Sequence, residues 1–101
     1  MMREFTEEEY VASLNEQRHM YVWCLKSIGG LSDSDANSEA ESIYRYKSQS
    51  EEHRYLVLHE DAWHWAMLKI NGELYWITNP ELQTESVEYN QEYERYIQNP
   101  T

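Results

Sequence analysis

The residues best suited to metal or acid–base chemistry lie between His59 and His64, a run that reads HEDAWH. A zinc-protease helix carries two histidines four positions apart, so that both imidazoles reach one metal. Here the histidines are five positions apart, which on a helix separates them by about 140° around the axis. Glu60 and His64 share a face, but further ligands would have to come from His53, His19 or a distant carboxylate. An exposed Glu–His pair is the simpler interpretation, and we predict no metal site and no cofactor.

Nucleophilic catalysis finds no support in the sequence. Cys24 is the only cysteine, and no motif places it beside His19 or His64. No serine lies in the strand-to-helix turn of a hydrolase, and the three glycines form no phosphate-binding loop. We therefore predict no catalytic residue and a protein that is not an enzyme, in which Cys24 is a half-buried residue of a helix.

Aromatic residues are the stronger signal for a site. If residues 63–65 are helical, Trp63 and Trp65 point about 200° apart, so a small domain can hardly bury both in one core. One indole must then face outward or face another element, and exposed aromatic surface is typical of binding sites. The alternative is that Tyr75, Trp76 and a C-terminal helix cover it. The predicted binding residues are Trp63, His64, Trp65, Tyr75, Trp76 and Glu60.

The charge of the chain restricts its partners. Nineteen acidic residues against eight Lys and Arg give a net charge of −11. Such a surface repels nucleic acid and anionic lipid, because both bind through Lys and Arg. We predict no direct nucleic-acid binding and no membrane association. A single cysteine permits no internal disulfide, and the sequence shows neither the apolar run of a signal peptide nor a membrane span, so we expect a cytoplasmic protein.

Helix signals dominate the chain, which we expect to form a single domain over residues 1–101. Thr6 and Glu9 match a capping box, and Gly29-Gly30 ends the apolar stripe that follows, which predicts a helix over 6–28. A second helix should run from about residues 31–37 to Tyr46 or Lys47. A last helix is expected over about 84–98.

The segment 53–70 has two interpretations. As a helix it places Tyr55, Leu58 and Trp65 on one face, and its content of helix-forming residues favours this reading. As strands it would form a hairpin across Asn71-Gly72, a strong two-residue turn signal. We predict an all-α fold of three to four helices with an extended segment around 73–78. The alternative is an α+β fold with an antiparallel hairpin over 54–78.

Part of the same stretch is similar to known proteins. The run LHEDAWHWAML over residues 58–68, followed by Gly72, Tyr75-Trp76 and Pro80-Glu81-Leu82, resembles small bacterial proteins of the integron mobile gene cassette type. This resemblance covers only the stretch 58–82. It implies a bacterial accessory protein of the cytoplasm and implies no catalytic residue.

Two classes of function agree with these features. The first is a non-catalytic protein-interaction module, either a homodimer formed through an aromatic face or an acidic inhibitor or antitoxin of a basic partner. The second is a small-molecule-binding protein, in which the tryptophans line an apolar pocket and His64 or Glu60 orients a small apolar ligand.

Overall fold

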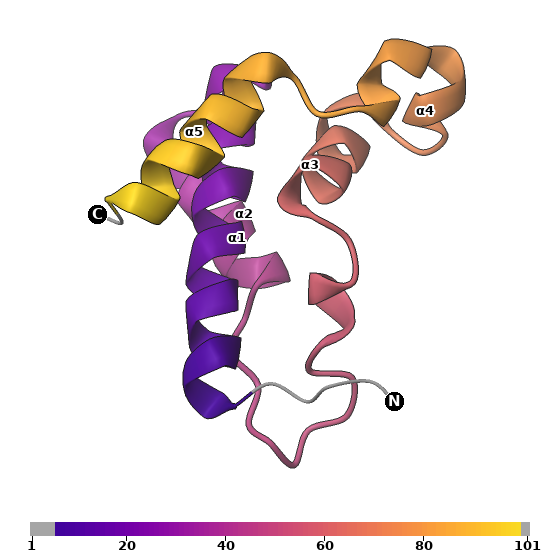
Figure 1. The fold of residues 1–101 in the computed structure, drawn as a ribbon. Coiled ribbons are helices and arrows are strands. Elements are labelled where there is room, and N and C mark those ends of the chain that lie inside the picture. The colour runs from indigo at the N-terminus through magenta and orange to yellow at the C-terminus, as the bar shows by residue number, and fades with distance from the viewer. Residues whose placement is uncertain (1–5, 100–101) are drawn as a thin grey trace.

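The computed structural model describes residues 6–99, which form five α-helices and no strand (Figure 1). In chain order the elements are α1 (Glu7–Ser27), α2 (Asp33–Ile43), the 3-10 turn η1 (Leu56–Leu58), α3 (Ala62–Asn71), α4 (Tyr75–Thr78), the 3-10 turn η2 (Pro80–Gln83) and α5 (Val87–Gln98). The all-α prediction is confirmed, with one short helix more than expected. The alternative hairpin over 54–78 is wrong.

No helix in the described part of the chain has both the length and the apolar character needed to cross a membrane.

The first helix forms the centre of the molecule, and its predicted ends are confirmed within a residue. The Thr6 hydroxyl accepts from the Glu9 amide at 3.1 Å, and the Glu9 carboxylate accepts from the Thr6 amide at 2.9 Å. Beyond the helix, Gly30 takes a φ of 73°, which glycine adopts without the steric cost that other residues meet. The helices α2, α3 and α5 all pack against α1, as Figure 1 shows.

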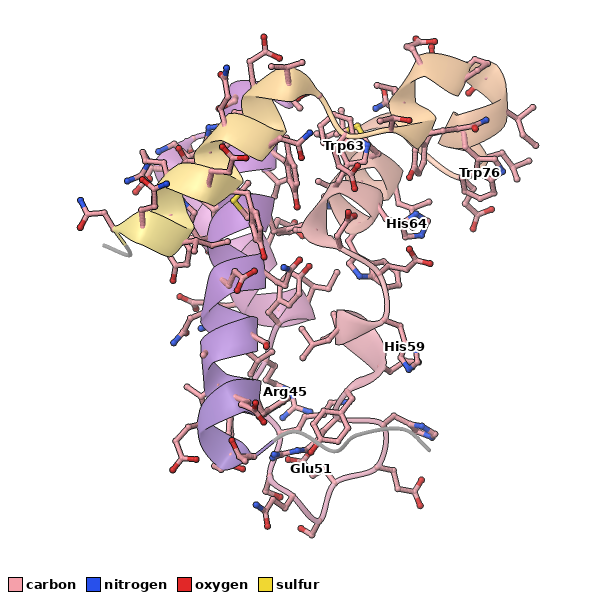
Figure 2. All side chains as sticks on the ribbon, in the orientation of Figure 1. Arg45, Glu51, His59, Trp63, His64 and Trp76 are labelled. Atoms are coloured by element: carbon pink, nitrogen blue, oxygen red, sulfur yellow. The ribbon has the colours of Figure 1, made fainter. Side chains whose placement is uncertain are left out.

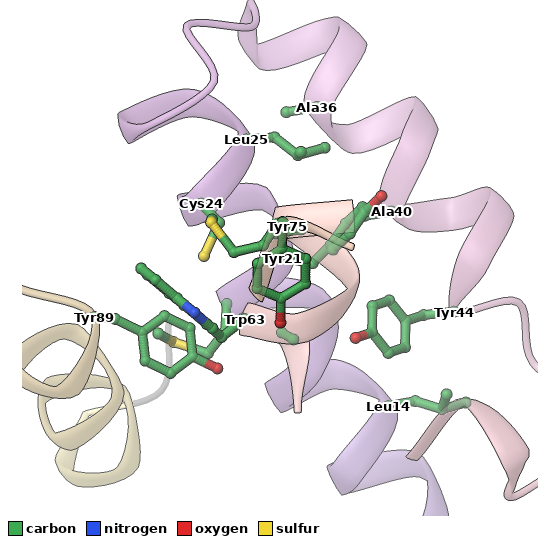
Figure 3. Packing of buried hydrophobic residues seen from close by; sticks show 14 of the residues in the cluster. Leu14, Tyr21, Cys24, Leu25, Ala36, Ala40, Tyr44, Trp63, Tyr75 and Tyr89 are labelled. Atoms are coloured by element: carbon green, nitrogen blue, oxygen red, sulfur yellow. The ribbon is translucent and has the colours of Figure 1, made fainter. Parts of the chain in front are cut away.

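The core that these helices enclose contains many aromatic rings (Figure 3). Trp63 meets Tyr89 edge to face, with ring centroids 5.5 Å apart. Tyr21 and Tyr44 form a second such pair at 5.7 Å. Edge-to-face pairs add about 0.5–1.5 kcal/mol beyond the area they bury. The buried hydrophobic residues are Tyr10, Leu14, Met20, Tyr21, Cys24, Leu25, Ala36, Ala40, Tyr44, Ala62, Trp63, Ala66, Met67, Tyr75 and Tyr89.

The second helix ends at Ile43, before the predicted limit at Tyr46 or Lys47. Tertiary hydrogen bonds replace helical ones in the residues that follow. The Tyr44 carbonyl accepts from the Arg18 guanidinium at 2.5 Å, and the Lys47 amide donates to the Tyr10 hydroxyl at 3.1 Å. Both partners, Arg18 and Tyr10, lie on α1. The spacing of residues within the second helix therefore could not predict where that helix ends.

The third predicted helix begins at Ala62 and not at residue 53. His53 has a φ of 62°, a left-handed conformation that interrupts a right-handed helix. Asp61 then caps α3, and its carboxylate accepts from the His64 amide at 3.1 Å. Aspartate is among the strongest N-cap residues. The stretch 53–61 therefore forms turns and η1 where the apolar spacing predicted one continuous helix.

The predicted extended segment around 73–78 is also wrong, because Tyr75–Thr78 forms the single turn of α4. Gly72 and Leu74 have φ angles of 86° and 64°, and these two left-handed residues bend the chain sharply after α3. The turn signal at Asn71-Gly72 thus ends a helix instead of joining two strands. The last helix begins at Val87, slightly later than predicted, because the Ser86 hydroxyl caps it.

Candidate functional site

The bend after α3 brings the aromatic residues of α3 and α4 together. His64 on α3 lies beside Tyr75 and Trp76 on α4, and its Nδ1 is within 3.0 Å of the Tyr75 hydroxyl. The rings of His64 and Trp76 are 6.2 Å apart, and Figure 2 shows both at the junction of α3 and α4. These residues line an open hollow of about 420 Å³, here called the acidic hollow. Its lining consists of Glu60, Asp61, Trp63, His64, Tyr75, Trp76, Gln83 and Glu85.

Five of the six predicted binding residues therefore lie around one hollow, and Trp65 does not. Trp63 and Trp65 point to different sides of α3, as helical spacing predicts. The Trp63 indole is 4% exposed, and its N–H donates to the Leu82 carbonyl at 2.8 Å. The Trp65 indole donates to the Val57 carbonyl at 3.0 Å. The sequence analysis expected one indole to face either solvent or another element. Trp65 is that indole, and it faces the segment that contains Val57.

An acid pair at the hollow escaped the sequence analysis. Burial first, and the neighbouring Glu85 carboxylate second, raise the pKa of Asp61 to about 7. A hydrogen bond from Asp61 lowers the pKa of Glu85 in turn. Two carboxyl groups in contact hold one proton between them because both cannot easily be charged. Asp61 is thus the proton carrier of the pair in weakly acidic solution, and Glu85 is the anion.

The remaining polar groups of the acidic hollow are held in place by the fold. Burial and the nearby carboxylates of Asp61 and Glu60 raise the pKa of the Tyr75 phenol, so the hydroxyl keeps its proton at neutral pH. The Gln83 side chain donates to the Trp76 carbonyl at 2.8 Å, which ties η2 to α4. The lining contains three carboxyl groups and neither lysine nor arginine.

The other candidate residues do not form a reactive or metal-binding group. Cys24 lies on α1 as predicted, but it is fully buried and not half-buried. Burial raises the pKa of its thiol to about 12. Within residues 6–99 no three His, Cys, Asp or Glu side chains are arranged to hold a metal. Glu60 precedes the cap of α3, so the predicted helical pair of Glu60 and His64 is wrong. His59 likewise lies before α3 (Figure 2).

Comparison with known proteins gives no further assignment. No protein-family model matches the chain, and neither a curated protein nor a solved structure matches it.

Proposed function

We propose that this protein binds a small organic cation in the acidic hollow. The observation that carries the proposal is that the partly exposed Trp76 ring lies at one opening with three carboxyl groups, among them Glu60. Ring faces attract cations through the ring quadrupole, by about 0.5–1 kcal/mol in exposed sites and about 2 kcal/mol in desolvated ones. Carboxylates add charge attraction and disfavour anions. A cationic head, such as a quaternary ammonium, matches both features.

This proposal refines the small-molecule hypothesis, which expected an apolar ligand. A purely apolar ligand would leave the Glu60 and Glu85 carboxylates partly desolvated without a partner, which is unfavourable. A cation gains from the same groups. The resemblance of residues 58–82 to gene-cassette proteins agrees with an accessory role in a bacterial cytoplasm, and it identifies no ligand.

A pair of matched probes tests the charge requirement. Choline and its neutral isostere 3,3-dimethyl-1-butanol have nearly the same shape and differ in charge. We expect choline to cause saturable NMR shifts at the Trp76 indole N–H, and the neutral isostere to bind at least about tenfold more weakly, which corresponds to about 1.4 kcal/mol. Equal binding of the two probes, or no saturable shift with choline, would refute the proposal.

Two matched variants test the location. Glu60→Gln removes a charge at the acidic hollow, whereas Glu41→Gln removes one from an exposed position on α2. We expect choline binding to weaken several-fold in the first variant and to stay within twofold of the original protein in the second, since distant exposed charges are screened by salt. An equal effect of both variants would indicate only a general attraction to the acidic surface.

A protein-interaction module remains a second candidate, favoured by exposed apolar residues next to the acidic hollow. Leu74 and Ile77 are 51% and 62% exposed, and both lie in or beside α4. A homodimer joined through this surface would bury them. Light scattering on the original protein and on Ile77→Ser tests this, with Ile97→Ser as control because Ile97 is also exposed, at 53%, but lies on α5. A dimer lost only in the first variant would support self-association, and a monomer at all concentrations would exclude it.

A further inference from the structure

A second hollow lies on the other side of the α3 start, between the end of α2 and η1. Its volume is about 370 Å³. We call it the basic hollow, and the residues that matter for its chemistry are Ile43, Arg45, Lys47, Arg54, Val57 and Trp65. Three of the chain's eight Lys and Arg residues therefore surround one opening in a protein with a net charge of −11. Such a concentration of cationic side chains is unexpected in so acidic a chain.

The three cations of the basic hollow differ in how far their charges are already compensated. Arg54 donates to Glu7 at 2.8 Å. Arg45 lies 3.6 Å from Glu51 in a pair exposed to solvent (Figure 2), and such pairs are weak and exchange readily. Among residues 6–99 no carboxylate lies within ion-pair distance of the Lys47 ammonium, although the charge of Lys47 acts on Glu51 from further away. Of the three cations, Lys47 is therefore the one least compensated by direct contact, and we expect it to anchor an incoming anion.

Arg54 fixes the backbone that carries Lys47. Its side chain is only 4% exposed, and its guanidinium lies 3.9 Å from the centre of the Tyr10 ring. One nitrogen of the guanidinium donates to the Lys47 carbonyl at 2.9 Å, while the Lys47 amide donates to the Tyr10 hydroxyl at 3.1 Å. Both backbone groups of Lys47 are held, so binding would cost little ordering of this segment.

The apolar side of the basic hollow is equally well ordered. The Trp65 indole is held by its hydrogen bond to the Val57 carbonyl at 3.0 Å, and Ile43 and Val57 also line the hollow. Ligand sites typically combine such apolar walls with a few polar groups that orient the ligand. The walls here would accept a ring or a branched aliphatic group, and the lysine would accept an anionic group attached to it.

We propose that the basic hollow binds a small organic anion, a carboxylate on an aromatic or branched apolar body, with the carboxylate at Lys47 and Arg45 and the body against Trp65. This site is separate from the acidic hollow and would take a ligand of opposite charge. It does not depend on the proposed binding of cations.

The experiment is an NMR titration with 1-naphthylacetate and its neutral analogue 1-naphthylacetamide. The reporter is the indole N–H of Trp65, which a Trp65→Phe spectrum identifies. We expect saturable shifts at this N–H and at the Lys47 amide, and binding of the neutral analogue at least about tenfold weaker, as a lost charge-assisted hydrogen bond implies. Absence of saturation, equal affinity for both probes, or shifts confined to Trp76 would overturn the proposal.

A matched pair of lysine variants tests the anchoring group. Lys47→Gln removes the ammonium at the basic hollow, and Lys26→Gln removes an equal charge from α1, where Lys26 pairs with Asp33 at 2.9 Å. We expect naphthylacetate to bind about tenfold more weakly to the first variant and within twofold of the original affinity to the second. Dispersed amide spectra of both variants establish that they are folded. Unchanged affinity in Lys47→Gln would contradict the assigned role of Lys47.

Discussion

Replacing Asp61 by asparagine should stabilise the protein at alkaline pH and leave it nearly unchanged in acid. Asparagine is as good an N-cap as aspartate, so the hydrogen bond from the His64 amide is retained. Its amide can also donate to Glu85, as protonated Asp61 does. The variant therefore imitates the protonated form of the acid pair at every pH.

The magnitude follows from the pKa of Asp61, which rises from 3.8 to about 7 on folding. Between these values the folded chain binds more protons than the unfolded chain, so Asp61 contributes stability in acid that is lost as the pH rises to about 7. The full difference corresponds to about 4 kcal/mol. Asp61 is only half-buried, and solvent screening reduces the expected loss to about 1–2 kcal/mol. Glu85 has a lowered pKa, so its effect on stability has the opposite pH dependence. The stability that Glu85 contributes is lost as the pH falls below about 4.5.

Urea unfolding at pH 4, 6 and 8 and constant ionic strength measures this effect. At pH 8 we expect the free energy of unfolding of Asp61→Asn to be about 1–2 kcal/mol higher than that of the original protein. At pH 4 the two values should be nearly equal. Glu41→Gln is the control, since it also relieves the excess negative charge but lies away from the acid pair. A variant less stable than the original at pH 8, or a pH dependence identical to that of the original, would refute the reasoning.

Three further predictions concern the rest of the fold. Arg54→Met should lower the urea midpoint more than Arg95→Met, because Arg54 is buried against Tyr10 and Lys47 whereas Arg95 pairs with Glu92 at the surface; equal midpoints would contradict this. Thr6→Ala should lower the free energy of unfolding by about 1 kcal/mol, because the N-cap is lost. Thr6→Ser should keep most of this stability, since serine also caps helices. Equal stability of the two variants would argue against the cap. Burial raises the pKa of the Cys24 thiol to about 12. At pH 8 this thiol should therefore react with a disulfide reagent at least about 100-fold more slowly than in the urea-unfolded chain. Similar rates would show that the thiol is accessible.

The parts of the fold that were predictable are those set by neighbouring residues. Thr6 and Glu9 cap the first helix from within one turn, and Gly29-Gly30 ends it, so its bounds could be read from sequence. The stretch 53–61 could not, because its apolar spacing suits a helix while the cap at Asp61 and the left-handed His53 interrupt it. A periodic pattern shows which residues are apolar, and it does not show which competing local conformation wins.

The candidate site was predictable to a similar extent. The concentration of rings at Trp63, His64, Tyr75 and Trp76 marked the place, since these residues are close in sequence. The acid pair was not visible, because Asp61 and Glu85 are separated by α3, α4 and η2. Only the folded arrangement of these elements brings the two carboxyl groups together, and neither residue is unusual in so acidic a chain.

The way α4 and η2 are attached has a consequence for how the molecule opens. Their main contacts are with each other and with α3, and in Figure 1 α4 lies at the edge of the molecule, away from α1. Segments with few contacts exchange their amide hydrogens through local openings that cost far less than global unfolding. Amides of α4 should exchange before those of α1. A ligand bound against Trp76 should slow exchange in α4. Hydrogen exchange in this single turn would therefore report sensitively on whether the acidic hollow is occupied.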